Sequence, residues 1–184
     1  MLVPVGISNR HFHCTKEDFI ALFGKETFVI KANVKQPKNF ACEETVTIRT
    51  AKNEIKNVRL LGPFRKYTQV EISATDARTL GINPPVRESG DVENAASLEI
   101  VGPNGTITTT GCIIAQRHIH ITFEDQKKLG LPDVVSVKVE GEKGGILSDV
   151  HIKASEEAYF EIHLDTDEAN AFKLSNDQEL KIIY

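Results

Sequence analysis

The segment Arg10-His11-Phe12-His13 recurs in the second half of the chain as Arg117-His118-Ile119-His120. The likeness continues without a gap to Asp18 in the first copy and to Asp125 in the second. Self-similarity between two halves of a chain indicates duplication of a folding module. The 184 residues therefore form either one domain with internal symmetry or two small, related domains.

Each copy contains a His-x-His triplet. Along a β-strand, side chains at positions i and i+2 leave the same face, roughly 7 Å apart at their Cβ atoms. The two histidines of a triplet can thus converge on one metal ion, while Phe12 or Ile119 between them packs toward the core. The alternative is a pair of solvent-facing polar positions on amphipathic strands. Repetition of the triplet with the same flanking residues favours metal binding.

A catalytic zinc site usually has three protein ligands and one open position, so each triplet needs a third donor. His163 lies on an expected strand in the second half, and Glu71 lies at nearly the corresponding place in the first. The predicted ligands are His11, His13 and Glu71 for one ion and His118, His120 and His163 for the other. These donor sets suit Zn²⁺, and Fe, Co, Ni and Mn accept the same donor types.

Other residues near the triplets have simpler interpretations. Cys14 should leave the strand face opposite His13, so a structural thiol is favoured over a third ligand. Glu17 and Glu124 reproduce the His-x-His-x3-Glu spacing of cupins. Both fall in expected first turns of helices, where a carboxylate faces solvent and interacts with the helix dipole. His151 alternates with apolar neighbours, as an ordinary half-exposed strand histidine does.

Short β-patterned runs broken by Gly, Pro and Asn dominate the rest of the chain, which favours barrels or sandwiches over a doubly wound sheet. Only short helices are expected, and the first and third should begin at Thr15 and Thr122 and end at Gly24 and Gly130. The expected helices are residues 16–23, Thr75 to Leu80, residues 123–129 and Thr166 to Lys173. A weaker echo of the duplication pairs residues 70–77 with residues 160–169.

Composition excludes several function classes. A formal net charge of −4, a pI near 5.9 in the absence of a long basic cluster, and no Trp argue against nucleic-acid binding. No stretch approaches the roughly 18 apolar residues of a membrane span, and no secretory signal is apparent, so a cytoplasmic location is expected. Three scattered cysteines fit reduced thiols better than a disulfide framework. Short edge strands are compatible with a homo-oligomer.

Five motifs in order along the chain carry a resemblance to a known family. They are residues 4–13 (PVGISNRHFH), the Gly-Pro-x-Arg-x-x-Thr-Gln-Val-Glu segment at 62–71, residues 85–91 (PVRESGD), residues 115–120 (AQRHIH) and the segment from His163 to Asn170. With these motifs the chain resembles the phosphate propanoyltransferases, the PduL-type phosphotransacylase family.

The resemblance implies a mainly β fold of two small barrels with short capping helices, joined by a chain crossover. One barrel would comprise residues 1–9 and 118–184, and the other residues 10–117. It also implies two Zn²⁺ ions per chain at the six ligands named above. The implied reaction converts an acyl-CoA (propanoyl-CoA or acetyl-CoA) and phosphate reversibly into acyl phosphate and CoA, by direct transfer at a dinuclear zinc site.

Further residues are assigned by the same resemblance. Arg65 matches the family's phosphate-binding arginine, and a guanidinium suits bidentate binding of phosphate. Ser8, Arg59, Leu61 and Asn170 match its CoA contacts, although Arg59 could equally form an ordinary surface ion pair. The resemblance also implies a link to propanediol degradation, and many members that work inside bacterial microcompartments carry an extra amphipathic N-terminal segment for encapsulation. This chain begins almost directly at the first motif, so we expect either a free cytoplasmic enzyme or a shortened form from the microcompartment lumen.

Two rival functions remain at this point. A cupin-like oxygenase or isomerase would bind one ion in each module through Glu17 or Glu124. A metal-stabilised shell or scaffold protein would need the metal ions but not Arg65. The sequence does not indicate which acyl chain is preferred.

Overall fold

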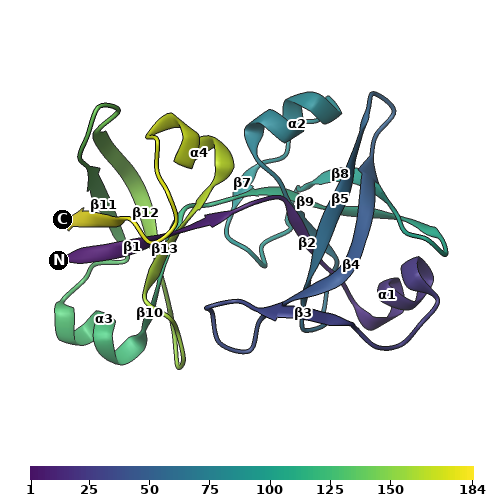
Figure 1. Cartoon of the computed structure of the whole chain (residues 1–184), viewed down its shortest axis with the longest axis horizontal. Coiled ribbons are helices and arrows are strands. Elements are labelled where there is room, and N and C mark those ends of the chain that lie inside the picture. Colours follow the sequence, from purple (N-terminus) through teal and green to yellow (C-terminus); the bar gives the residue numbers. More distant parts are fainter. The chain divides into compact units, whose positions relative to one another are not determined.

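Two closed six-stranded β-barrels form the fold of this protein, as the computed structural model of residues 1–184 shows (Figure 1). One unit contains Met1–Asn9 and Gln116–Tyr184, and we call it the split unit. The other contains Arg10–Ala115, and we call it the central unit. The expectation of a mainly β fold with two barrels and internal duplication is confirmed, and the sandwich alternative is wrong.

In the split unit, the first strand of the chain completes a barrel made otherwise from the C-terminal part. β1 pairs in parallel with β13 and antiparallel with β14, so both edges of the N-terminal strand are used (Figure 1). A closed ring has no free sheet edge. In ring order the strands are β1 (Leu2–Ser8), β13 (Glu161–Asp165), β10 (His118–Thr122), β12 (Gly145–Ser155), β11 (Val134–Val139) and β14 (Glu179–Ile183). The helices are α3 (Phe123–Leu129) and α4 (Thr166–Ala171).

The central unit repeats this plan with longer hairpins. Its ring runs through β4 (Phe40–Arg49), β5 (Glu54–Gly62), β2 (His11–His13), β6 (Gln69–Glu71), β9 (Thr106–Ala115) and β8 (Ala96–Val101), which returns to β4. Strands β3 (Ile30–Asn33) and β7 (Val86–Arg87) extend the sheet beyond the ring, and the helices are α1 (Lys16–Phe23) and α2 (Ala74–Leu80).

Alternation along the triplet strands decides which side chains fill each core. Ile119 and Ile121 are buried among Val, Leu and Ile residues in the split unit, whereas His118 and His120 leave the other face of β10. Phe12 is fully buried in the hydrophobic core of the central unit, which also contains Phe19. The prediction that Phe12 and Ile119 pack inward is confirmed.

The expected helix caps are confirmed, with one correction. The side chains of Thr15 and Thr122 accept the backbone N–H groups of residues 18 and 125, and Gly24 and Gly130 end these helices in the left-handed conformation. Helix α4, however, ends at Ala171 and not at Lys173. Lys173 has a φ of 55°, and the Leu174 N–H bonds back to the Ala169 carbonyl, which stops the helix earlier.

All three cysteines are buried free thiols. No helix combines the length and the apolar character that a membrane-spanning segment requires.

Candidate metal centres

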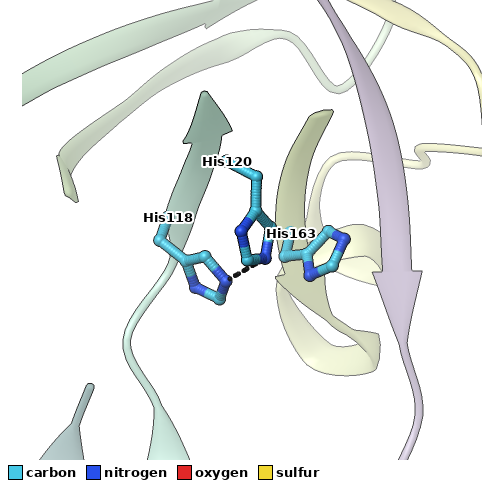
Figure 2. A group of neighbouring side chains, drawn as sticks. All are labelled: His118, His120 and His163. Carbon is cyan, nitrogen blue, oxygen red and sulfur yellow. Dashed lines mark hydrogen bonds between the residues drawn. The ribbon is translucent and has the colours of Figure 1, made fainter. Parts of the chain in front are cut away.

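The three histidines predicted in the second half lie together in the split unit, on neighbouring strands. His118 and His120 come from β10, and His163 lies directly opposite His118 on β13. Their rings point toward one another, with centroids 4.6 to 5.2 Å apart (Figure 2). One nitrogen from each ring can be chosen so that all three lie within 4.8 Å of one another. We call these residues the split-unit cluster.

Hydrogen bonds decide which nitrogens of this cluster are available. The Nδ1 atom of His118 lies 2.8 Å from the Gln116 carbonyl oxygen. Because a carbonyl only accepts, this nitrogen carries the proton, and the Nε2 lone pair faces His120 at 3.1 Å. Burial, with smaller contributions from His118, His163 and Lys153, lowers the pKa of His120 to about 2. The ring of His120 is therefore neutral near pH 7, the state in which histidine binds metals.

The central unit brings His11, His13 and Glu71 together in the same way, and we call these residues the central cluster. His11 and His13 lie on β2, and Glu71 lies opposite His11 on β6. The Nε2 atom of His11 is 3.4 Å from a Glu71 carboxylate oxygen. His13 donates through Nδ1 to the Leu61 carbonyl at 2.9 Å, which leaves its Nε2 unprotonated. Burial first, and then the neighbouring His11, lowers the pKa of His13 to about 3.

Both clusters fit a zinc-like ion. Each has three nitrogen or carboxylate donors, the number that catalytic zinc sites take from the protein. Two nitrogens bound to one tetrahedral ion at about 2.0–2.1 Å lie about 3.3 Å apart. The His118 to His120 separation of 3.1 Å is close to that value. The residues of the two clusters could therefore hold a metal ion each.

A family model described as phosphate propanoyltransferase matches residues 4–175. A phosphate propanoyltransferase from Thermotoga maritima is 48% identical, covering 98% of this chain and 89% of its own length. One from Rhodobacter capsulatus is 46% identical over 98% of this chain and 86% of its own. One from Rhodopseudomonas palustris is 45% identical over 98% of this chain and 81% of its own length.

The chain belongs to the phosphate propanoyltransferase family. Membership supports an acyltransferase enzyme and accords with the resemblance found in the sequence motifs.

The structure shows that the duplication includes an ion pair between an arginine and a capping helix in each unit. An arginine precedes each triplet, and each forms an ion pair with the third residue of a helix. Arg10 pairs with Asp76 of α2 at 2.8 Å, and Arg117 pairs with Glu168 of α4 at 2.8 Å. In each unit this helix follows the strand that carries the third ligand. Asp76 belongs to the capping box at the start of α2, and Glu168 to the one at the start of α4. Both ion pairs therefore attach the start of a triplet strand to a capping helix.

The structural equivalence of the two units corrects the weaker sequence similarity between residues 70–77 and residues 160–169. In the sequence alignment, residue 70 was matched with residue 160, so that Glu71 was aligned with Glu161. The strand register instead pairs Glu71 with His11 and His163 with His118, which makes Glu71 and His163 equivalent. A two-residue offset separates the two alignments, and only the cross-strand pairing reveals it.

Arg65 is placed by backbone contacts beside the central cluster. Its N–H donates to the Cys14 carbonyl at 2.9 Å, next in sequence to His13, and its charge contributes to the lowered pKa of His13. One guanidinium nitrogen, an Nη, donates to the Asn39 side-chain oxygen at 3.2 Å. The Nε atom is buried without a hydrogen-bond partner. A buried, unsatisfied donor of a cation is unusual and fits an anion-binding role.

The four residues matched to CoA contacts lie in both units. In the central unit, Arg59 pairs with His11 across β5 and β2 and donates to the Cys42 carbonyl at 2.6 Å. Leu61 supplies the carbonyl that fixes His13. In the split unit, Ser8 pairs with Asp165, the N-cap of α4, and Asn170 is an exposed residue of that helix.

The competing ligands are not part of either cluster. Glu17 and Glu124 are exposed in the first turns of α1 and α3, as expected, so the cupin-like spacing does not bring them to the histidines. Cys14 is 1% exposed in the core of the central unit. Burial, followed by the charge of Asp18, raises the pKa of this thiol to about 12, which keeps it in the protonated form that binds metals poorly.

Two residues of these sites were not found from the sequence. Gln69 and Glu161 are buried polar residues that contact Glu71 and His163 respectively. The available signal was their position, two residues before the third ligand in each copy.

Proposed function

We propose that the chain interconverts an acyl-CoA and phosphate with an acyl phosphate and free CoA, the acyl group being propanoyl or acetyl. Two zinc ions would be bound, one by each cluster, and phosphate would attack the thioester carbonyl directly without a covalent acyl-enzyme. The names of the relatives support the reaction class, and the donor types of the clusters support the metal.

The observation that carries the proposal is the environment of Arg65. Its buried Nε has no hydrogen-bond partner, and its positive charge contributes to the lowered pKa of His13 in the central cluster. Phosphate at neutral pH is a strongly hydrated anion and a weak nucleophile. A guanidinium that binds it through two N–H groups supplies both orientation and charge stabilisation.

Zinc bound at such donor sets acts as a Lewis acid toward oxygen anions and accepts a thiolate readily. The protein's own contribution is to hold the donors before substrate arrives. His13 and His118 are fixed by carbonyl groups through Nδ1, so their Nε2 lone pairs need no rearrangement. We further propose that Ser8, Arg59, Leu61 and Asn170 contact CoA.

The test is a phosphate-dependent assay of CoA release from propanoyl-CoA and acetyl-CoA. We expect Arg65→Ala to lower turnover by about 10²- to 10³-fold, the range found when one preorganised charge-stabilising donor is removed. Arg65→Lys should recover only part of the loss, because an ammonium cannot bind phosphate in the bidentate manner. Zinc content and circular dichroism should stay unchanged.

The matched control is Lys66→Ala, which removes the exposed neighbouring cation. It should retain nearly full activity. An Arg65→Ala protein with normal turnover would contradict the proposed role of this residue and would favour a structural metalloprotein.

A further inference from the structure

Each cluster has a fourth residue at an equivalent position in its sheet. In the central unit, β6 places Gln69 opposite His13 and Glu71 opposite His11. In the split unit, β13 places Glu161 opposite His120 and His163 opposite His118. Gln69 and Glu161 therefore occupy the same site of the duplicated frame, two residues before the third ligand and on the same strand face.

Gln69 is fully buried, and all its contacts agree on one orientation of the amide. Its oxygen accepts the Gly90 N–H at 2.8 Å, so its nitrogen must face the other way. That nitrogen donates to the Glu71 carboxylate at 2.7 Å and to the Ser89 hydroxyl at 3.0 Å. Gln69 thus holds one oxygen of Glu71, while the other faces His11.

Glu161 does the reverse for the split-unit cluster. It is 3% exposed, and its carboxylate accepts the Nε2–H of His163 at 2.9 Å. In the neutral ring this hydrogen bond leaves Nδ1 of His163 as the lone-pair nitrogen, and Figure 2 shows the His163 ring beside that of His120. Residue 6 on the neighbouring strand β1 is glycine, and a Cβ there would lie 2.5 Å from the Glu161 carboxylate in its present position, so a larger residue would require that carboxylate to move.

In the two pairs, Gln69 with Glu71 and Glu161 with His163, the charged and the neutral member have exchanged roles. In the central cluster an anionic ligand, Glu71, is held by a neutral donor, whereas in the split-unit cluster a neutral ligand, His163, is held by an anionic acceptor. Each cluster consequently contains one buried carboxylate among its four residues. A carboxylate that accepts from a ligating imidazole fixes its tautomer and raises its basicity.

We propose that Gln69 and Glu161 are positioning residues for metal binding, and that each is matched to the ligand it holds. Glu161 directs Nδ1 of His163 to the ion, and Gln69 fixes the carboxylate of Glu71. The inference rests on the proposed function only in that the clusters hold zinc.

The first test measures zinc affinity by competition with a chromogenic chelator, without any acyl-CoA. The full-length chain carries His11→Ala and His13→Ala, so that only the split-unit cluster binds. In this background Glu161→Ala should weaken zinc binding by about 10- to 100-fold, and Glu161→Gln, which keeps an acceptor oxygen but loses the charge, by less. The control Glu140→Gln removes a carboxylate that is 77% exposed in the same unit and should change nothing.

The second test exchanges the pairs and measures a gain. With the split-unit cluster removed by His118→Ala and His120→Ala, Glu71→His alone places a histidine beside Gln69 and should bind zinc weakly. Adding Gln69→Glu recreates the His163 and Glu161 pair in the central unit. We expect this addition to tighten zinc binding by about tenfold, and the cobalt-substituted protein to show a changed visible spectrum.

A merely structural role for the two residues would not produce that gain. Unchanged zinc affinity in the Glu161 variants, or a further loss of affinity on adding Gln69→Glu, would overturn the inference. If Glu161→Ala fails to fold, the exchange of the pair in the central unit still tests it. Failure of the proposed function looks different. The unmodified protein would then bind zinc, and the variants would shift its affinity as described, but no phosphate-dependent CoA release would occur.

Discussion

The central cluster and the split-unit cluster have the same strand register and the same Arg-to-helix ion pair, but they differ in the third ligand and its exposure. The Glu71 side chain is 10% exposed, whereas the His163 side chain is 21% exposed. The central cluster has a carboxylate where the split-unit cluster has an imidazole, and two residues earlier it has a glutamine where the split-unit cluster has a glutamate. The comparison indicates that each ligand is chemically matched to the residue that holds it, since exchanging either residue alone would leave a mismatched buried contact.

The largest effect is expected from removing a ligand in either half. His13→Ala and His120→Ala should each lose about one of two zinc ions and lower CoA release by more than about a hundredfold, because each ion keeps only two protein donors. Metal analysis after dialysis, combined with the activity assay, measures both. The control is His151→Ala, which changes a half-exposed histidine on β12 outside both clusters. Full activity after loss of one cluster would show that the halves are not equally required.

Acid should destabilise the metal-free protein through both clusters. A histidine ordinarily titrates near pH 6.5, but the folded-state pKa is about 3 for His13 and about 2 for His120. Below pH 6.5 the unfolded chain therefore binds protons that the folded chain does not. Stability is fully present above about pH 6.5 and falls as the pH drops toward about 3, by about 1.4 kcal/mol per pH unit for each histidine.

Urea titrations of the metal-free protein between pH 4 and pH 7 measure this slope. His13→Gln and His120→Gln should each lower the slope by the equivalent of about one proton bound on unfolding. An unchanged slope in one variant would mean that the two clusters do not exclude protons equally.

A smaller difference is expected between the two arginine ion pairs. Arg10 contacts both oxygens of Asp76, whose side chain is 6% exposed, whereas Arg117 contacts one oxygen of Glu168, whose side chain is 19% exposed. Arg10→Gln should therefore cost about 2 kcal/mol of unfolding free energy, and Arg117→Gln about 1 kcal/mol. Denaturant midpoints measure both, and equal losses would contradict the importance of burial.

The smallest effect concerns the acids with cupin-like spacing. Glu17→Gln and Glu124→Gln should leave zinc content unchanged and lower stability by no more than about 0.5 kcal/mol, through weaker interaction with the helix dipole. Metal analysis and thermal unfolding test this. Loss of an ion from either variant would restore the cupin-like interpretation.

Local features were predictable from the sequence, and long-range pairings were not. The caps at Thr15 and Thr122 depend on residues three positions away, and the inward packing of Phe12 and Ile119 depends on strand alternation. The two-barrel topology followed from the family resemblance, because short β-patterned runs alone left a sandwich open. The ion pair of Arg10 with Asp76 spans 66 residues, and the equivalence of Gln69 with Glu161 depends on cross-strand register, which no local pattern specifies.

The most direct test of the central claim is phosphate-dependent CoA release from propanoyl-CoA, with acetyl-CoA in parallel, by the purified, the chelated and the zinc-restored protein. We predict that activity is present, is lost on chelation and returns with zinc. Activity that survives complete removal of metal, or no release from protein holding about two zinc ions per chain, would contradict the account.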